Sequence, residues 1–226
     1  MIIAIDGPAA AGKGTLARRL AEHLGFIYLD TGLLYRAVGK KTVDSGFDPE
    51  DVASVEAIAR ALALEDLEVD GLRTDEVAQL ASKVSAIPSV RTALLEFQRS
   101  FAKAPPEGKH GAVLDGRDIG TVVCPDAHVK LFVTARTKVR AQRRFKELQK
   151  RGLEAIYARV LEDIKERDTR DSSRATSPLE PASDAYQLDT SALDANQVFA
   201  KALEIVGVAG IGDRDPQRDE VQNEAL

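Results

Sequence analysis

A short glycine-bearing segment between two apolar runs constrains the fold of this 226-residue chain more than any other feature. The run MIIAI at the start is too short and too apolar for anything but a buried strand. The run TLARRLAEHL (15–24) has leucines at helical spacing and is followed by Gly25, a residue that commonly ends a helix. Residues 7–14 read GPAAAGKG, so the sequence predicts a tight loop that joins a strand to a helix.

This loop has the spacing of a phosphate-binding loop. Gly7 is followed by four residues and then by Gly12 and Lys13, which is the Walker A pattern. In such loops the backbone N–H groups and the start of the following helix face a bound phosphate. A hydroxyl residue usually follows the lysine, but here Gly14 follows and Thr15 comes next. A chance glycine-rich turn is the alternative. The predicted nucleotide-binding residues are Gly7, Pro8, Ala9, Ala10, Ala11, Gly12, Lys13, Gly14 and Thr15.

Strand-like and helix-like runs alternate along the chain, which predicts an α/β fold with a parallel five-stranded sheet flanked by helices. The segment 45–75 interrupts this alternation and is expected to be a small insert, first helical and then with a β-turn in LEVDGL. Residues 207–226 have dense charge and little apolar content, and we expect a flexible tail. The expected strands are 2–6, 26–32, 111–116, 128–135 and 185–191, and the expected helices are 15–24, 31–43, 50–63, 74–103, 137–150, 154–169 and 194–206.

Charge is distributed unevenly in a chain of net charge −5. Residues 136–174 contain 13 Lys or Arg and 7 Asp or Glu, a local excess of +6, which leaves −11 for the remainder. A basic segment in an acidic protein favours a localised anionic ligand over a nucleic acid polymer, whereas a solvated helix face of mixed charge is the alternative. Cys124 is the single cysteine, and no long apolar run or signal-like N-terminus is present, so we expect a cytoplasmic protein without a membrane span.

Three arginine-bearing segments follow predicted strands or lie in loops, where α/β sheets present their ligand crevice. These segments are DTGLLYR (30–36), DGRDIGTVV (115–123) and IKERDTRDSSR (164–174). Arginine binds phosphate oxygens bidentately, and three clusters suit a donor triphosphate together with a phosphorylated acceptor. A surface ion pair is the alternative for any single arginine. Asp115 ends an apolar strand, where a carboxylate either holds Mg²⁺ or starts a turn.

Together with GPAAAGKGT and ASKVSAIPSVR (81–91), these segments resemble the bacterial cytidylate kinase family over residues 2–206. The resemblance implies a P-loop NTPase-type kinase that uses ATP and Mg²⁺ to phosphorylate CMP or dCMP, acting as a monomer. It also implies a core of residues 1–44 and 76–206 with a lid at about 144–170, and a nucleoside-monophosphate-binding insert at 45–75 that is shorter than the family's usual one. The family has serine where this chain has Thr31, and a hydroxyl is retained.

The resemblance also assigns roles to individual residues. Lys13, Arg117 and Arg170 would be catalytic, with Arg170 reaching the transferring group, and Thr15 and Asp115 are candidate Mg²⁺ ligands. The alternatives are a kinase for UMP or AMP, or a P-loop nucleotide sensor without turnover. The implied substrate residues are Arg36 and Arg117 for the CMP phosphate, Thr31 and Tyr35 beside it, Ser82, Arg91 and Asp118 for cytosine, and Arg167, Asp171 and Arg174 for the sugar and neighbouring phosphates.

Overall fold

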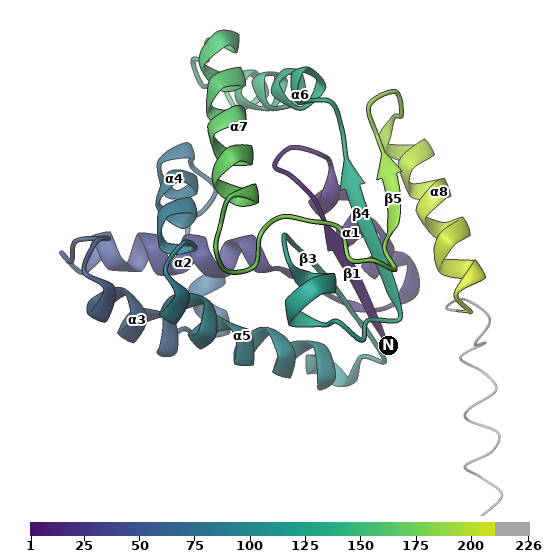
Figure 1. The fold of residues 1–226 in the computed structure, drawn as a ribbon, viewed down its shortest axis with the longest axis horizontal. Helices are drawn as coiled ribbons and strands as arrows, with labels where there is room; N and C mark the ends of the chain where they lie inside the picture. Colours follow the sequence, from purple (N-terminus) through teal and green to yellow (C-terminus); the bar gives the residue numbers. More distant parts are fainter. Residues whose placement is uncertain (211–226) are drawn as a thin grey trace, which may run out of the picture.

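The computed structural model describes residues 1–210, and within them the predicted five-stranded parallel sheet is confirmed (Figure 1). The strands lie in the order β2-β3-β1-β4-β5, and every neighbouring pair is parallel. Consecutive strands of this kind need crossover connections, which the helices between them supply. The strands are β1 (Ile2–Asp6), β2 (Ile27–Asp30), β3 (Ala112–Gly116), β4 (Val129–Thr134) and β5 (Tyr186–Asp189).

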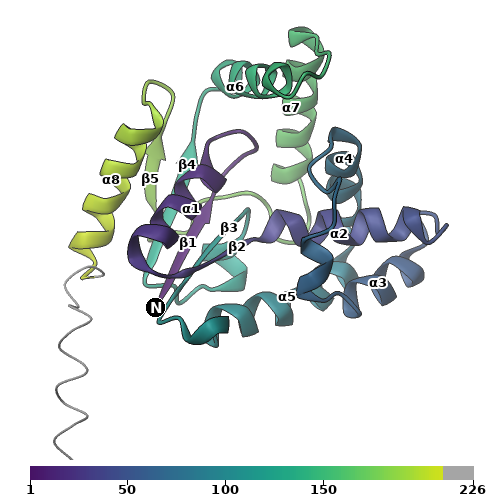
Figure 2. The same cartoon turned by 180° about the vertical axis from the view of Figure 1, so that it is seen from behind.

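Alternate residues of the central strand β1 supply two separate cores. Ile3 and Ile5 pack on one face with residues of α1 (Lys13–Leu24) and α8 (Ala195–Val208). Ala4 points to the other face and packs with residues of α2 (Thr31–Asp44) and α5 (Pro88–Lys103). Side chains of a strand point to opposite faces in turn, so the apolar residues 3–5 of β1 are buried on both sides of the sheet. Figure 2 shows α8 beside β5 and the helices α2–α5 gathered on the opposite side of the sheet.

The helices on that side differ from the expected pattern at one place. The single helix expected over 74–103 is wrong: the chain forms α4 (Asp75–Val84) and α5, and Ile87 between them is extended. The residue before a proline is disfavoured in helical conformation, and Pro88 therefore starts a new helix. The segment 45–75 is helical first, as expected, in α3 (Val52–Arg60), which is followed by a 3₁₀ turn, η1 (Leu64–Leu67). The turn expected in LEVDGL lies at residues 70–73, where the N–H of Thr74 donates to the carbonyl of Gly71 at 3.2 Å. Helix α3 packs against α2 and α5.

Helices α6 (Thr137–Lys150) and α7 (Tyr157–Ser172) form an arm beyond the carboxyl ends of the strands, and the predicted lid range 144–170 lies on this arm (Figure 1). The two helices have their own small core of Ala141, Leu148, Val160 and Ile164. The buried guanidinium of Arg140 on α6 pairs with Asp168 on α7 at 2.5 Å and donates to the carbonyl of Ala9 at 3.1 Å. Arg140 thus connects both arm helices to the loop after β1.

The end of the chain is only partly covered by the structure. Gly207 and Val208 belong to α8, so the expected tail does not begin at 207. The prediction of a flexible tail from residue 211 onward lies outside the described residues. None of the helices in residues 1–210 has the length and apolar character that crossing a membrane requires.

We expect Asp168→Asn to lower the free energy of unfolding by about 1–3 kcal/mol, because it leaves the buried Arg140 guanidinium without its anionic partner. Urea unfolding followed by circular dichroism measures the change. Glu162→Gln on the same helix is the matched control: its carboxylate pairs with Lys165 at 3.6 Å on the exposed surface, and we expect less than about 0.5 kcal/mol. Equal effects of the two substitutions would contradict the anchoring role of Arg140.

Candidate active site

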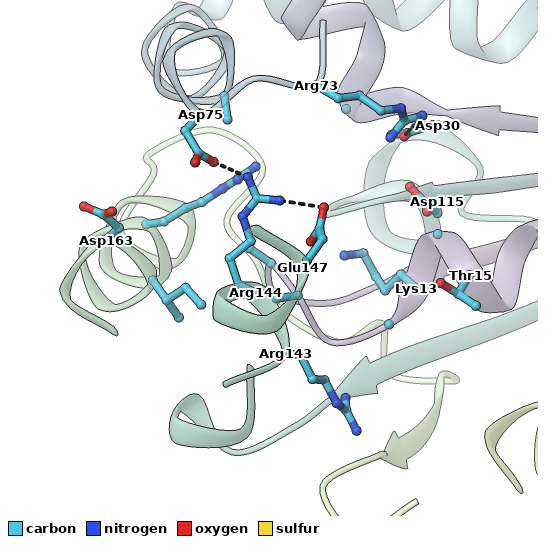
Figure 3. A pocket seen from close by; sticks show the side chains of 18 of the residues that line it. Lys13, Thr15, Asp30, Arg73, Asp75, Asp115, Arg143, Arg144, Glu147 and Asp163 are labelled. Atoms are coloured by element: carbon cyan, nitrogen blue, oxygen red, sulfur yellow. Dashed lines mark hydrogen bonds and ion pairs between the residues drawn. The ribbon is translucent and has the colours of Figure 1, made fainter. Parts of the chain in front are cut away.

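A cavity of about 530 Å³ opens where β1, β2 and β3 end. The loop after β1 supplies Gly12 and Lys13, while β2 and β3 supply their last acidic residues, Asp30 and Asp115. Helices α4, α6 and α7 form the opposite wall, to which Asp75, Arg144 and Asp163 belong (Figure 3). The cavity therefore lies at the carboxyl edge of the sheet and beneath the arm, the usual ligand position in an open α/β fold.

The loop 7–12 has the conformation that a phosphate-binding loop requires. Gly7 has φ +144°, and a Cβ there would lie 1.9 Å from the carbonyl oxygen of Val133, so no other residue fits. Gly12 is also left-handed, with φ +99°, and α1 begins immediately after it at Lys13. The Lys13 ammonium folds back over the loop and donates to the carbonyl of Pro8 at 3.1 Å. Because α1 begins directly after this loop, its N-terminus lies at the cavity, and a helix N-terminus favours an anion.

Lys13 is 7% exposed and stands in a cationic environment. Burial lowers the pKa of Lys13, and nearby Arg117 lowers it further, while Asp115 opposes the shift. A bound phosphate would reverse this effect, because an adjacent anion favours the charged ammonium. The electrostatics around Lys13 therefore favour a site whose anion comes from a ligand.

Two carboxylates face Lys13 across the cavity (Figure 3). Burial raises the pKa of Asp115, and the neighbouring Asp30 raises it further. The Tyr28 hydroxyl donates to Asp115 Oδ2 at 3.1 Å, and Arg73 pairs with Asp30 at 3.2 Å. A carboxylate whose charge is disfavoured by burial and by a second carboxylate is a suitable place for a cation.

Arginines of several elements converge on the cavity, and some lack full pairing among residues 1–210. Burial lowers the pKa of Arg167 to about 9, with a further contribution from Arg117. The buried Nε of Arg167 has no hydrogen-bond partner in the described chain. Arg36 donates to the carbonyl of Leu72 at 2.9 Å, and Arg144 lies between Asp75 and Glu147 (Figure 3). The arginines lining the cavity are Arg18, Arg36, Arg73, Arg117, Arg143, Arg144 and Arg167.

A smaller cavity of about 50 Å³ adjoins the first. The two share Gly32, Arg117 and Arg167, so these residues stand at the junction. A buried ion pair between Arg91 and Asp118 forms part of its wall.

Asp171, which also lines the smaller cavity, forms ion pairs with two guanidinium groups. Arg117 Nε donates to Asp171 Oδ2 at 2.8 Å, and Arg174 pairs with its other oxygen. Burial would raise the pKa of Asp171, but these arginines outweigh burial and hold it below its usual value. Asp171 is therefore ionised and fixes Arg117 at the junction of the cavities.

Most of the site residues predicted from the sequence line one of the two cavities. Three residues of the loop line neither cavity: Gly7, Pro8 and Ala11. Arg170 also lines neither cavity, and its guanidinium donates to Gln79 Oε1 at 2.9 Å. The larger cavity is lined by Ala9, Ala10, Gly12, Lys13, Gly14, Thr15, Arg36 and Asp115, the smaller by Thr31, Tyr35, Ser82, Arg91, Asp118, Asp171 and Arg174, and both by Arg117 and Arg167.

Several charged residues of the lining were not singled out from the sequence, among them Asp30, Arg73, Asp75, Arg143 and Arg144. Arg143 and Arg144 lie in the basic segment 136–174, whose charge excess was the available signal, and Asp30 begins the segment DTGLLYR. Arg73 and Asp75 carry no comparable signal, because they stand in the expected insert and reach the cavity only through the packing of α4.

Comparisons with known proteins agree with this geometry. The sequence profile of the family described as cytidylate kinase matches residues 3–207. A protein named cytidylate kinase from Paramagnetospirillum magneticum is 68% identical over 91% of this chain and 97% of its own length. Proteins of the same name from Methylocella silvestris and Rhodospirillum rubrum are 58% and 57% identical over 91% of this chain and 94% and 97% of their own lengths. The chain belongs to the cytidylate kinase family.

Proposed function

We propose that the chain transfers the terminal phosphoryl group of ATP to CMP or dCMP, with ATP in the larger cavity and the monophosphate across the junction, its phosphate in the larger cavity and its base toward the smaller one. Its membership of the cytidylate kinase family makes it a nucleoside monophosphate kinase. The observation that carries the proposal is the junction of the two cavities, where Arg117 and Arg167 line both. A group passing from one nucleotide to the other would cross between these two guanidinium groups.

On the donor side, the loop 7–12 and the start of α1 would surround the ATP phosphates. Lys13 would neutralise the β- and γ-phosphates, and the ligand would restore the ammonium charge that burial disfavours. The oxygen donors of Asp30, Asp115 and Thr15 line the same wall and fit Mg²⁺, which prefers oxygen ligands together with nucleotide phosphates. When bound, the ion would neutralise charge on the β- and γ-oxygens.

On the acceptor side, the nucleophile would be a phosphate oxygen, which is already anionic and needs no general base. Catalysis then rests on positioning and on neutralising charge between two anionic reactants. Arg117, held by Asp171, and Arg167 would supply that neutralisation at the junction of the cavities. Arg36 would hold the acceptor phosphate from the α2 side.

The buried Arg91–Asp118 pair would read the base. Cytosine offers acceptors at O2 and N3 and a donor at its amino group, whereas uracil has a donor at N3 and an acceptor at O4. Arg91 only donates, and Asp118 only accepts when ionised. Ser82 Oγ is buried without a hydrogen-bond partner in the described chain and adds a second polar group to this wall.

The arm of α6 and α7 would exclude water from the reacting phosphates. Arg144 reaches α4 through its ion pair with Asp75, and Arg170 reaches it through Gln79. These contacts join the arm to α4, so that the three helices together cover one side of the larger cavity. Transfer to a nucleotide rather than to water requires such cover. We further propose that the enzyme acts as a cytoplasmic monomer, which size-exclusion chromatography tests for the oligomeric state.

The substrate assignment is tested by measuring ADP release in a coupled assay with CMP, dCMP, UMP and AMP as acceptors. We expect CMP and dCMP to have kcat/KM values about ten- to a thousandfold above those of UMP and AMP, because a wrong base leaves buried polar groups unpaired. A preference for UMP or AMP would transfer the assignment to another monophosphate kinase. ATP binding without ADP release with any acceptor would instead support a nucleotide sensor.

We expect Arg36→Ala and Arg170→Ala to affect different kinetic constants. Arg36 lines the cavity and would hold the acceptor phosphate, so its loss should chiefly raise the KM for CMP. Arg170 would reach the transferring group only after leaving Gln79, so its loss should lower kcat more than it raises that KM. Steady-state kinetics at saturating ATP separates the two effects, with Gln79→Ala as the control for the contact between α7 and α4. The reverse pattern would contradict these roles.

A further inference from the structure

We propose that Asp6 is a positioning residue that keeps the Asp118 carboxylate free to read the base. Asp6 is the last residue of β1, immediately before Gly7 of the phosphate loop, and it is 5% exposed. It lines neither cavity, so it would act only through the segment that carries Asp118. This inference rests on the proposed role of Asp118 in cytosine recognition.

Asp118 occupies a position where an aspartate side chain normally accepts hydrogen bonds from backbone N–H groups. It is the N-cap of a π-helical segment, η3 (Ile119–Val123), and an N-cap aspartate usually accepts hydrogen bonds from the first free N–H groups of its own helix. Asp118 makes no such bond. Its carboxylate instead forms the buried ion pair with Arg91.

The capping bonds are supplied by Asp6, more than a hundred residues away in the sequence. The backbone N–H of Ile119 donates to Asp6 Oδ1 at 2.8 Å, and that of Gly120 donates to Oδ2 at 2.7 Å. Both oxygens of Asp6 are thus engaged by the amides that would otherwise attract Asp118. The backbone of the segment is satisfied, and Asp118 remains available to Arg91 and the cavity.

Close packing holds this arrangement in place. A Cβ at Gly120 would lie 3.3 Å from Asp6 Oδ2 and 3.1 Å from Cδ of Lys130, so the segment lies tightly between the two side chains. Lys130 Nζ donates to the carbonyl of Pro125 at 2.5 Å and pairs with Asp184 at 2.8 Å. Asp6 therefore fixes the start of the segment, and Lys130 fixes the chain just after its end.

Asp6→Asn is the most informative substitution, because it keeps the size of the side chain but replaces one acceptor oxygen with an NH₂ group. One of the two amides then loses its acceptor, and Asp118 becomes the alternative cap. Asp118 would turn from Arg91 toward that amide. The expected signature is a loss of base selectivity that leaves ATP binding unaffected.

The experiment measures kcat/KM for CMP and UMP, and the KM for ATP, in the wild type, Asp6→Asn, Asp118→Ala and the double variant. We expect Asp6→Asn to narrow the CMP-to-UMP ratio of kcat/KM about tenfold, while its KM for ATP stays within about twofold of wild type. We expect the double variant to narrow the CMP-to-UMP ratio no further than Asp118→Ala does. Asp189→Asn is the matched control, since Asp189 also ends a strand but is exposed and accepts a hydrogen bond from the N–H of Ser191 at 2.8 Å. Its ratio should stay unchanged.

Two results would overturn the inference but keep Asp118 as the residue that recognises the base. In the first, Asp6→Asn leaves the CMP-to-UMP ratio of kcat/KM unchanged while Asp118→Ala narrows it. In the second, the double variant narrows this ratio by the product of the two separate factors. An unchanged ratio in Asp118→Ala would remove that role, and this inference with it. If Asp6→Asn unfolds in thermal denaturation, Gly120→Ala replaces it, because its methyl group would press on the Asp6 carboxylate without removing it. A narrowed ratio in Gly120→Ala supports the inference, and an unchanged ratio overturns it.

Discussion

Lys13→Ala is expected to lower kcat by about a hundred- to a thousandfold while leaving the fold intact. The ammonium stands at the phosphate loop, and no other lysine lines the larger cavity among the described residues. Its only hydrogen bond there is to the carbonyl of Pro8, and its charge is disfavoured in the free protein, so the fold depends little on it. The charge is needed only when the phosphates are present, which is the condition for a contribution to the transition state.

Steady-state ADP release measures this loss, and thermal unfolding checks that the variant remains folded. Lys201→Ala is the matched control, because Lys201 is an exposed lysine of α8 remote from both cavities. Near-normal turnover in Lys13→Ala would contradict the assignment of the phosphate loop.

The lowered pKa of Lys13 adds a pH dependence with a definite sign. Bound triphosphate favours the charged ammonium, so the pKa of Lys13 rises on binding, and ATP binding takes up a proton wherever the free lysine is neutral. ATP affinity should therefore fall as pH rises from about 7 to 9, and isothermal titration in buffers of different ionisation enthalpy should show proton uptake. Both effects should be lost in Lys13→Ala. Equal pH dependence in the variant would assign the proton to another group.

The second large effect is expected for Asp118→Ala, which should lower kcat/KM for CMP about a hundredfold and narrow the CMP-to-UMP ratio at least tenfold. The carboxylate is buried against Arg91, and its removal leaves a buried guanidinium without its anionic partner. It also removes the acceptor proposed for the cytosine amino group, so CMP loses a contact that UMP never had. The free energy of unfolding should fall as well, by about 3 kcal/mol, as it does when one partner of a buried pair is removed.

The measurement is kcat/KM for both nucleotides, together with urea unfolding of the free protein. Asp126→Ala is the control, since Asp126 lies on the same connection between β3 and β4 but is exposed and lines neither cavity. A stability loss with an unchanged CMP-to-UMP ratio would make Asp118 a structural partner of Arg91, and Ser82 or the backbone would have to read the base.

The sequence predicted the sheet and the phosphate loop because both are local patterns. Residues 2–15 contain an apolar strand followed by glycines and a lysine, and this pattern can be recognised from adjacent residues alone. The family resemblance placed a lid at about 144–170, a range that lies on α6 and α7, and its action as a lid stays a prediction. The division of 74–103 was missed although Pro88 marks it, because the helical period continues on both sides of the break.

The rest of the site depends on contacts between residues far apart in the chain. Asp75 and Arg73 reach the larger cavity only because α4 packs against α2, and no local pattern specifies that packing. Asp6 looks like a strand-end aspartate in the sequence, and its bonds to Ile119 and Gly120 appear only when β1 lies beside β3. The same holds for Arg170, whose contact with Gln79 joins α7 to α4.

Phosphoryl transfer is proposed to run between two adjoining nucleotide sites in one chain. It is tested most directly by incubating the protein with ATP labelled at its γ-phosphate and with CMP, and by separating the labelled products. We expect the label to enter the β-phosphate of CDP far faster than it enters UDP from UMP, and Lys13→Ala to slow this transfer about a hundred- to a thousandfold. Label released chiefly as inorganic phosphate, or passed equally to CMP, UMP and AMP, would show that the chain does not transfer the phosphoryl group selectively to a cytidine nucleotide.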